Sequence, residues 1–276
     1  MSDRLNAALR ARFTDAPDTP ADLAGNDAVH TMAARGSCRA FRPDPVPMPV
    51  IETLCAVALS APSKSDLQQR DIVIVQDPAL KAQIVALLSA QTWIADAPHL
   101  LVFCANNRRQ RQVHEFQGLP FANDHLDAFF NASVDAGIAL GSFVNAAEAA
   151  GLGCCPISTI RNHAGQVSDL LRLPDHVFPV AALALGHPVR APRISPRLPL
   201  RATVHHDTFS DDTLAEDLAH YDAHRATVQP YRTQRSAERY GTSPAYTWSM
   251  DKARQYSLPE RADFAAFIKA KGFNLD

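Results

Sequence analysis

Arginine and serine side chains alternate in the segment from Arg35 to Arg39, which follows the end of a predicted helix. Arg35, Ser37 and Arg39 are separated by Gly36 and Cys38, so in an extended chain their side chains point to one side. Guanidinium groups donate hydrogen bonds in a planar fork that fits the oxygens of a phosphate. This spacing indicates a phosphate-binding face, and the alternative interpretation is a solvated basic turn.

A second candidate binding segment is the loop that follows an apolar helix and contains Ser63, Ser65 and Gln68. Hydroxyl and carboxamide groups there can hydrogen-bond the edge of a heteroaromatic ligand, although a plain helix-capping loop has the same composition. Arg197, which lies between two prolines, is a further candidate for binding a phosphate.

The segment from Gly151 to Ser158 contains two glycines and the adjacent pair Cys154-Cys155. The glycines allow close approach to the backbone, or simply form a tight turn between a helix and a strand. A cysteine nucleophile is disfavoured because no histidine lies nearby to activate it, and apolar neighbours raise a thiol pKa. No Ser-His-Asp set or carboxylate pair is evident, so we assign no catalytic side chain.

The composition excludes several classes of protein. The chain has 276 residues, 46% of them apolar, and a net charge of −2, which offers no reason to expect nucleic acid as a partner. No apolar run approaches the ~18 residues of a membrane span, and no secretory signal is visible. The five cysteines are odd in number and form no CxxC motif, so neither a disulfide framework nor a metal site is predicted. We expect a cytoplasmic protein with buried thiols at Cys55 and Cys104.

Four apolar runs predict the strands that position these segments, at 72–75, 100–104, 153–157 and 180–185. Helices are expected at 27–34, around 51–58, and at 78–90, 126–150, 162–171 and 260–271, with a loose helix at 1–13. The 126–150 helix is so apolar that we expect it to be buried all round, in part by a second subunit. Alternating strands and helices would suggest a parallel sheet. Prolines after Gly186 predict irregular structure.

Residues 1–26 form an expected N-terminal extension, and residues 27–276 one domain with a C-terminal excursion at about 190–260. Over residues 28–275 the chain resembles the FMN-dependent nitroreductase and flavin reductase family, most closely its group A, the NADPH-preferring, oxygen-insensitive nitroreductases. The segments that carry this resemblance are Arg35 to Phe41, Ser63 to Gln68, Ala95 to Ala105, Gly151 to Gly153, Ile160 to Asn162, Leu171 to Val177, Pro196 to Pro199 and Thr247 to Ser249.

The resemblance implies an α+β fold, an α-β-α sandwich with a mainly antiparallel sheet, in an intertwined homodimer. It replaces the parallel sheet suggested by the alternation. It also implies that FMN binds non-covalently at the dimer interface, in contact with both chains. By position, its binding residues are Arg35, Gly36, Ser37, Arg39, Ser63, Ser65, Gln68, Pro156, Ile157, Ser158, Thr159 and Arg197.

The implied activity is a ping-pong reaction in which NADPH or NADH passes a hydride to flavin N5. Two electrons then reach a nitroaromatic, a quinone or a similar small acceptor. Two alternatives stay open, a flavin reductase that releases reduced FMN and a non-catalytic flavin-binding redox sensor. A hydrolase using Cys154 or Cys155 is a third rival.

The sequence departs from the family pattern in three places. Ser195 stands where the group has a lysine two residues before the arginine of Arg-Leu-Pro. Ser158-Thr159 replaces a usual Gly-Gly pair and narrows the space over the flavin. The basic loop for the NADPH 2′-phosphate has no clean match, and the candidates in that stretch are Arg232, Arg235 and Arg239.

Overall fold

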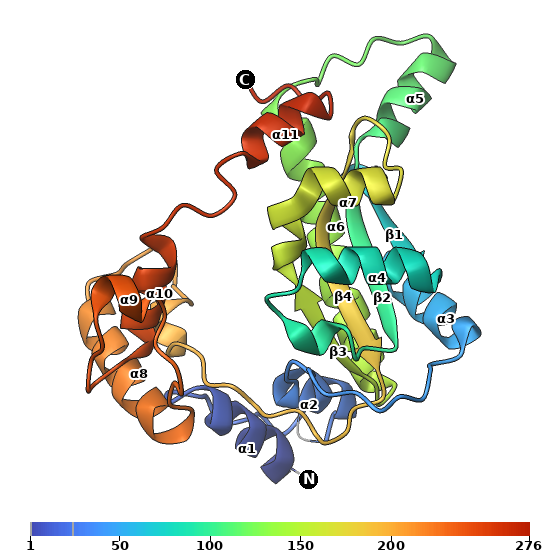
Figure 1. Cartoon of the computed structure of the whole chain (residues 1–276). Coiled ribbons are helices and arrows are strands. Elements are labelled where there is room, and N and C mark those ends of the chain that lie inside the picture. Colours follow the sequence, from blue (N-terminus) through green and yellow to red (C-terminus); the bar gives the residue numbers. More distant parts are fainter. Residues whose placement is uncertain (1, 24) are drawn as a thin grey trace. The chain divides into compact units, whose positions relative to one another are not determined.

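All four apolar runs form strands of one sheet in the computed structural model, which describes residues 2–23 and 25–276. The strands are β1 (Arg70–Val75), β2 (His99–Asn106), β3 (Gly153–Ile157) and β4 (Val177–Gly186). Their order is β1-β2-β4-β3, and each neighbouring pair is antiparallel (Figure 1). The antiparallel sheet implied by the resemblance is confirmed. The parallel sheet suggested by alternation is wrong, because a helical connection can return the chain to either end of a sheet.

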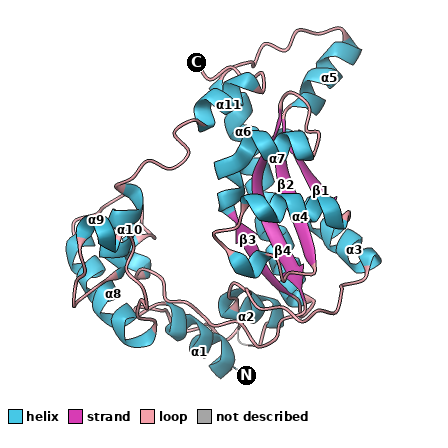
Figure 2. Ribbon diagram, in the orientation of Figure 1, coloured by secondary structure: helices cyan, strands magenta, loops and turns pink. Residues whose placement is uncertain are grey.

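Helices cover both faces of this sheet, as Figure 2 shows, which confirms the expected sandwich. Leu101 and Phe103 pack toward α3 (Met48–Leu59) and α6 (Leu126–Ala149). Leu100 and Val102 pack on the other face, toward α4 (Pro78–Leu87) and α7 (Ala164–Leu170). Successive side chains of a strand point to opposite faces, so a continuous apolar run supplies both cores at once. The expectation of two buried faces follows directly from such runs.

The long helix α6 is exposed along one stripe in the single chain. Leu126, Phe130 and Val134 are 50%, 60% and 41% exposed, and a Cβ added at Gly137 or Gly141 would meet no other described atom within 4 Å. The spacing of four, four, three and four residues places these positions on one side of the helix. The single chain leaves this stripe uncovered because it points away from the sheet, so burial of α6 all round by a second subunit stays a prediction.

Two glycines bring the stretch that carries Arg39 against the end of the sheet. Gly153 and Gly186 face each other across β3 and β4. A Cβ at Gly153 would lie 2.6 Å from the Sγ of Cys38, so only glycine leaves room for that side chain. The backbone N–H of Cys38 donates to the carbonyl oxygen of Cys154 at 2.9 Å. The chain after Ser37 can therefore pack against β3 because Gly153 has no side chain.

Contacts within the chain divide it into two units, Met1–Gly36 with Arg193–Glu260 and Ser37–Pro192 with Arg261–Asp276. The division expected from sequence, an extension over 1–26 and a domain over 27–276, concerns independent folding and stays a prediction. The second unit also holds α5 (Arg108–Gln117) and α11 (Phe264–Ala270). Its short 3-10 helices are η1 (Lys64–Asp66), η2 (Thr92–Ile94) and η3 (Ser158–His163), and η4 (Leu200–Ala202) lies in the first unit.

The first unit contains α1 (Ser2–Arg12), α2 (Asp27–Ala34), α8 (Leu214–Val228), α9 (Ala237–Tyr240) and α10 (Trp248–Tyr256). Asn26 caps α2 by accepting a hydrogen bond from the N–H of Val29, and the helix spans the predicted residues 27–34. The irregular structure expected after Gly186 gives way to helix at α8 and α10. Hydrophobic periodicity does not reveal these helices because they are mostly polar. In α8 only two side chains are buried, Asp217 and Tyr221. None of the described helices is long and apolar enough to cross a membrane.

Candidate functional site

The two predicted phosphate-binding residues of the first unit are joined through a residue that the sequence did not single out. Arg35 is the C-cap of α2, and Arg197 lies in the extended segment before η4. The guanidinium of Arg12 donates to the carbonyl oxygens of Arg35, at 2.5 Å, and Ser195, at 3.2 Å. The side chain of Arg197 is exposed, with Nη1 bonded to the carbonyl oxygen of Pro196 at 3.2 Å. Its remaining donors are accessible to an anion.

Ser37 and Arg39, the other two members of the alternating set, lie in the second unit and are both exposed. The guanidinium of Arg39 lies 5.9 Å from the ring centroid of Trp93. An aromatic face attracts a cation and limits its orientations without consuming its hydrogen-bond donors. Arg39 is therefore oriented and still able to donate to a ligand.

The loop that contains Ser63, Ser65 and Gln68 has an uncommon backbone. Ser65, Asp66 and Gln68 have φ angles of 47°, 57° and 51°, a left-handed region that few residues other than glycine adopt. Within the loop, the N–H of Gln68 donates to Ser63 Oγ at 3.2 Å. Such a conformation persists only where the surroundings impose it.

Asp135 of α6 imposes that loop conformation. Its side chain is buried, and its two carboxylate oxygens accept hydrogen bonds from the N–H groups of Lys64 and Gln69, each at 2.9 Å. One carboxylate thus holds both ends of the loop. Sequence analysis missed Asp135, although an acidic residue in the middle of an apolar helix is a detectable signal.

The residues predicted to contact the flavin ring, Pro156 to Thr159, lie at the end of β3 and the start of η3. Pro156 and Ser158 are exposed, Ile157 is buried and Thr159 is half-buried. The hydroxyl of Thr159 accepts a hydrogen bond from Gln91 Nε2 at 2.8 Å. This fixes the Thr159 side chain and leaves Ser158 as the exposed hydroxyl at this end of the sheet. Gln91, after Arg12 and Asp135, is a third residue that was not predicted from the sequence.

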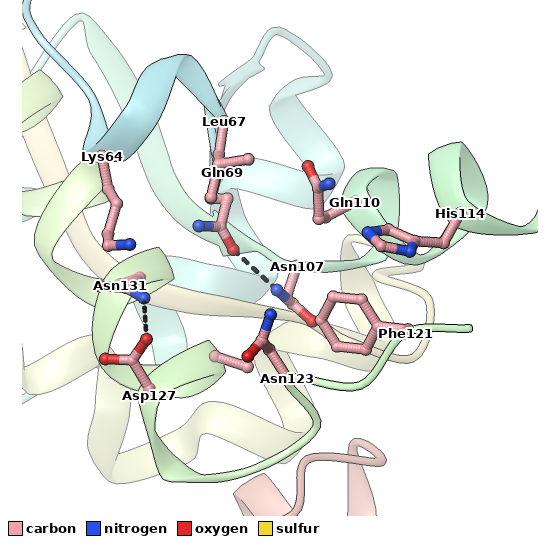
Figure 3. A pocket seen from close by; sticks show the side chains of 11 residues that line it. Lys64, Leu67, Gln69, Asn107, Gln110, His114, Phe121, Asn123, Asp127 and Asn131 are labelled. Carbon is pink, nitrogen blue, oxygen red and sulfur yellow. Dashed lines mark hydrogen bonds between the residues drawn. The ribbon is translucent and has the colours of Figure 1, made fainter. Parts of the chain in front are cut away.

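A polar cavity of about 270 Å³ lies beside the loop (Figure 3). Its residues are Lys64, Leu67, Gln69, Asn107, Gln110, His114, Phe121, Asn123, Asp127, Ala128 and Asn131. Asn107 Nδ2 donates to Gln69 Oε1 at 2.7 Å, and both of these side chains are buried. Carboxamides and one aromatic ring, together with Lys64, His114 and Asp127, suit a planar molecule with several hydrogen-bonding groups.

The thiols are poor nucleophiles where the structure defines their environment. Burial raises the pKa of Cys104 to about 12 and that of Cys55, which is half-buried, to about 11. Cys154 and Cys155 are buried, at 0% and 3% exposure. Neither Cys154 nor Cys155 is accessible enough to act as the nucleophile of a hydrolase. In the described part of the chain, no cluster of three or more His, Cys, Asp or Glu residues could hold a metal ion.

The three arginines expected near a 2′-phosphate differ in what they contact. Arg235 Nε lies 3.6 Å from an oxygen of Asp251, whose side chain is almost fully buried. Arg239 lies over the ring of Tyr240, at 5.6 Å from its centroid. Arg232 is exposed, and no hydrogen bond or ion pair joins its side chain to residues 2–23 or 25–276. Arg232 is the candidate with its full set of donors available.

Comparison with known proteins matches nearly the whole chain. Residues 32–187 match the sequence model of the Nitroreductase family, and residues 195–276 match that of its C-terminal domain. An FMN reductase [NAD(P)H] of Bacillus subtilis is 31% identical over 256 residues, covering 91% of this chain and 99% of the relative. An oxygen-insensitive NADPH nitroreductase of Salmonella typhimurium is 34% identical, covering 86% and 93%. The solved structure of NfrA2 from B. megaterium superimposes with a TM-score of 0.82 at 31% identity, covering 91% and 99%.

The contacts of Asp135 predict the effect of replacing it. In Asp135→Asn one acceptor oxygen becomes an NH2 group that faces a backbone N–H, so one loop end loses its partner. We expect a loss of about 1–3 kcal/mol in the free energy of unfolding, measured by urea titration. Asp127→Asn, on the exposed first turn of the same helix, is the control and should change stability by less than about 0.5 kcal/mol. Equal urea midpoints for Asp135→Asn and the wild type would contradict the anchoring role.

Proposed function

This chain belongs to the nitroreductase family, and we propose that it is an FMN-dependent oxidoreductase that takes electrons from NADPH or NADH. Its acceptors are nitroaromatics, quinones or similar small molecules. The observation that carries the proposal is the match of both family segments across nearly the whole chain, together with relatives named as FMN reductase and NADPH nitroreductase. The flavin-binding residues inferred from sequence support it by their chemistry.

The residue types that the resemblance assigns to the flavin suit FMN. In the first unit Arg35 and Arg197, and in the second Ser37 and Arg39, carry planar donors or a hydroxyl of the kind that a phosphate of about two negative charges accepts from. Gly36, the residue between Arg35 and Ser37, is buried. The segment from Pro156 to Thr159 would lie along the flavin ring, where it offers one exposed hydroxyl, at Ser158, while the side chain of Ile157 is buried in the core.

When bound, FMN supplies the two-electron chemistry by accepting a hydride from NAD(P)H and passing the electrons to the acceptor. The protein has to bind and orient the flavin and keep the reacting face apolar. None of these tasks needs an acid or a base from a side chain, so we assign none. The carboxamide-lined cavity beside the Ser63–Gln68 loop is suited to hold a polar planar acceptor.

A flavin reductase that releases reduced FMN is the second candidate function, and the Bacillus subtilis relative named FMN reductase favours it. The two activities differ in whether the flavin leaves after reduction. Because the proposed phosphate contacts come from several separate side chains, we favour a flavin that stays bound. A redox sensor is the non-catalytic alternative.

We also propose that two copies of the chain form the working unit. The exposed stripe of α6 offers Phe130 and Val134 beside the open Gly137 and Gly141, and Val57 on α3 is 52% exposed. Small and apolar residues at helical spacing allow another backbone to approach closely. In such a dimer the Ser63–Gln68 loop would approach the flavin of the other copy. Free thiols at Cys38, Cys55 and Cys104 support a reducing compartment, which we take to be the cytoplasm.

The function is tested by mixing the FMN-loaded protein with NADPH, and separately with NADH, in an anaerobic stopped-flow instrument. We expect rapid loss of the oxidised-flavin absorbance with at least one of the two, and its return when a quinone or nitroaromatic is added. A yellow protein that does not bleach would favour the sensor. A protein that binds no FMN would reject the proposed function.

The cofactor preference is predicted to depend on Arg232. Arg232→Ala should raise the KM for NADPH by about tenfold and leave that for NADH unchanged, because only NADPH carries a 2′-phosphate. Arg235→Ala is the matched comparison, and we expect a smaller effect because this arginine is already paired with Asp251. Steady-state kinetics with both cofactors measure this, and equal changes for NADPH and NADH would reject the role.

The proposed dimer face predicts the behaviour of a charged variant. Gly141→Arg places a long cation where the single chain has open space, so the fold of the monomer should tolerate it. Association should fail, because burying an unpaired charge between two helices is costly. Light scattering at micromolar concentration should find the wild type as a dimer and the variant as a monomer. A dimeric Gly141→Arg would place the interface elsewhere.

A further inference from the structure

We propose that Arg12 is a positioning residue for the phosphate-binding arginines Arg35 and Arg197. It lies in the N-terminal stretch that precedes the family match, which begins at residue 32. The inference rests on the proposed function, because its consequence is the affinity for FMN. It assigns a task to the segment that sequence analysis leaves as an extension.

The guanidinium of Arg12 joins two separate stretches of backbone. Nε and Nη2 donate to the carbonyl oxygen of Ala33 at 3.2 and 3.0 Å, and Nη2 also donates to that of Arg35 at 2.5 Å. Nη1 donates to the carbonyl oxygen of Ser195 at 3.2 Å. Arg12 is only 8% exposed, so these donors are withdrawn from water and depend on the carbonyls. The carbonyl oxygens of Arg35 and Ser195, 160 positions apart in sequence, thus share the rigid planar guanidinium of Arg12.

The backbone around Arg197 is held at three consecutive positions. Arg12 binds the Ser195 carbonyl, the hydroxyl of Tyr221 donates to the Pro196 carbonyl at 3.2 Å, and the N–H of Arg197 donates to the carbonyl oxygen of Arg12 at 2.7 Å. Only the Arg197 side chain is left exposed. A long flexible side chain on a fixed backbone loses less freedom on binding a phosphate than one on a mobile loop.

Local sequence explains how Arg12 reaches this place. Leu5, Ala8 and Arg12 are buried and lie three and four residues apart, on one face of α1. Just beyond the helix, Asp15 accepts hydrogen bonds from the N–H groups of Leu200 and Arg201, at 2.7 and 3.1 Å. The N-terminal segment therefore holds the chain on both sides of Arg197.

In the first unit the proposed phosphate grip rests on two arginines, Arg35 and Arg197. Its affinity therefore depends on how these two side chains are placed. Two guanidinium groups on segments that move independently gain less from a shared ligand than two groups held in register.

The test compares FMN with riboflavin, which lacks only the phosphate. Fluorescence titration should show that the wild type binds FMN more tightly than riboflavin. In Arg12→Ala the affinity for FMN should fall by about tenfold, ~1.4 kcal/mol, while that for riboflavin changes by less than about twofold. A general loss of structure would weaken the binding of FMN and riboflavin alike. The ratio of the two affinities therefore reports on the contacts with the phosphate alone.

Three further variants complete the experiment. Arg12→Lys keeps the charge but lacks the planar fork, so it should behave like Arg12→Ala and covers the case in which the alanine variant does not fold. Arg10→Ala removes an exposed arginine of the same helix, paired with Asp18 at 2.6 Å, and should keep the wild-type ratio. The double variant Arg35→Ala/Arg197→Ala removes both arginines and gives the affinity ratio expected when the phosphate contacts are lost completely.

A wild-type ratio in a folded Arg12→Lys or Arg12→Ala protein would overturn the positioning role while leaving the proposed function intact. A wild type that binds FMN no better than riboflavin, or binds neither, would reject the phosphate site itself and this inference with it.

Discussion

Two buried charges hold irregular segments of this chain, Asp135 in the second unit and Arg12 in the first. Asp135 accepts hydrogen bonds from both ends of the Ser63–Gln68 loop, and Arg12 donates to the carbonyl oxygens of Arg35 and Ser195. A charge removed from water has to be satisfied, and a backbone group in an irregular segment has the same requirement. Each buried charge therefore fixes the irregular backbone that satisfies it. The conformation of each segment depends on this exchange.

The regular part of the fold follows from local sequence. Unbroken apolar runs such as Leu100 to Cys104 predict strands buried on two faces, and the sandwich of α3 and α6 against α4 and α7 satisfies them. Asn26 marks the start of α2, and Gly151, with φ of +75°, marks the end of α6. The direction of the strands did not follow from the same patterns. It came from the resemblance, because the return of a connection to one or the other sheet end is a property of the whole chain.

The parts of the site that sequence analysis missed are those made by distant contacts. Asp135 is 71 positions from Lys64, and Arg12 is 183 from Ser195. No spacing rule connects such pairs, so Arg12 could only be counted among the residues of an extension. Residues that share a short segment, such as Ser63 and Gln68, were identifiable from their types. The assignment of those residues to FMN rests on the resemblance and stays a prediction, as does the choice among Arg232, Arg235 and Arg239.

In the proposed dimer, the glycines of α6 would tie the stability of the molecule to its concentration. A glycine inside a helix costs about 0.5–1 kcal/mol relative to alanine, and at Gly137 and Gly141 nothing in the described chain is close enough to require it. Such a helix is left locally weak by its own fold and becomes complete when another surface closes over it. If that surface belongs to a second copy, mass action links unfolding to dissociation, and dilution alone would lower the melting temperature. Protein made at low abundance would be both less assembled and more readily unfolded.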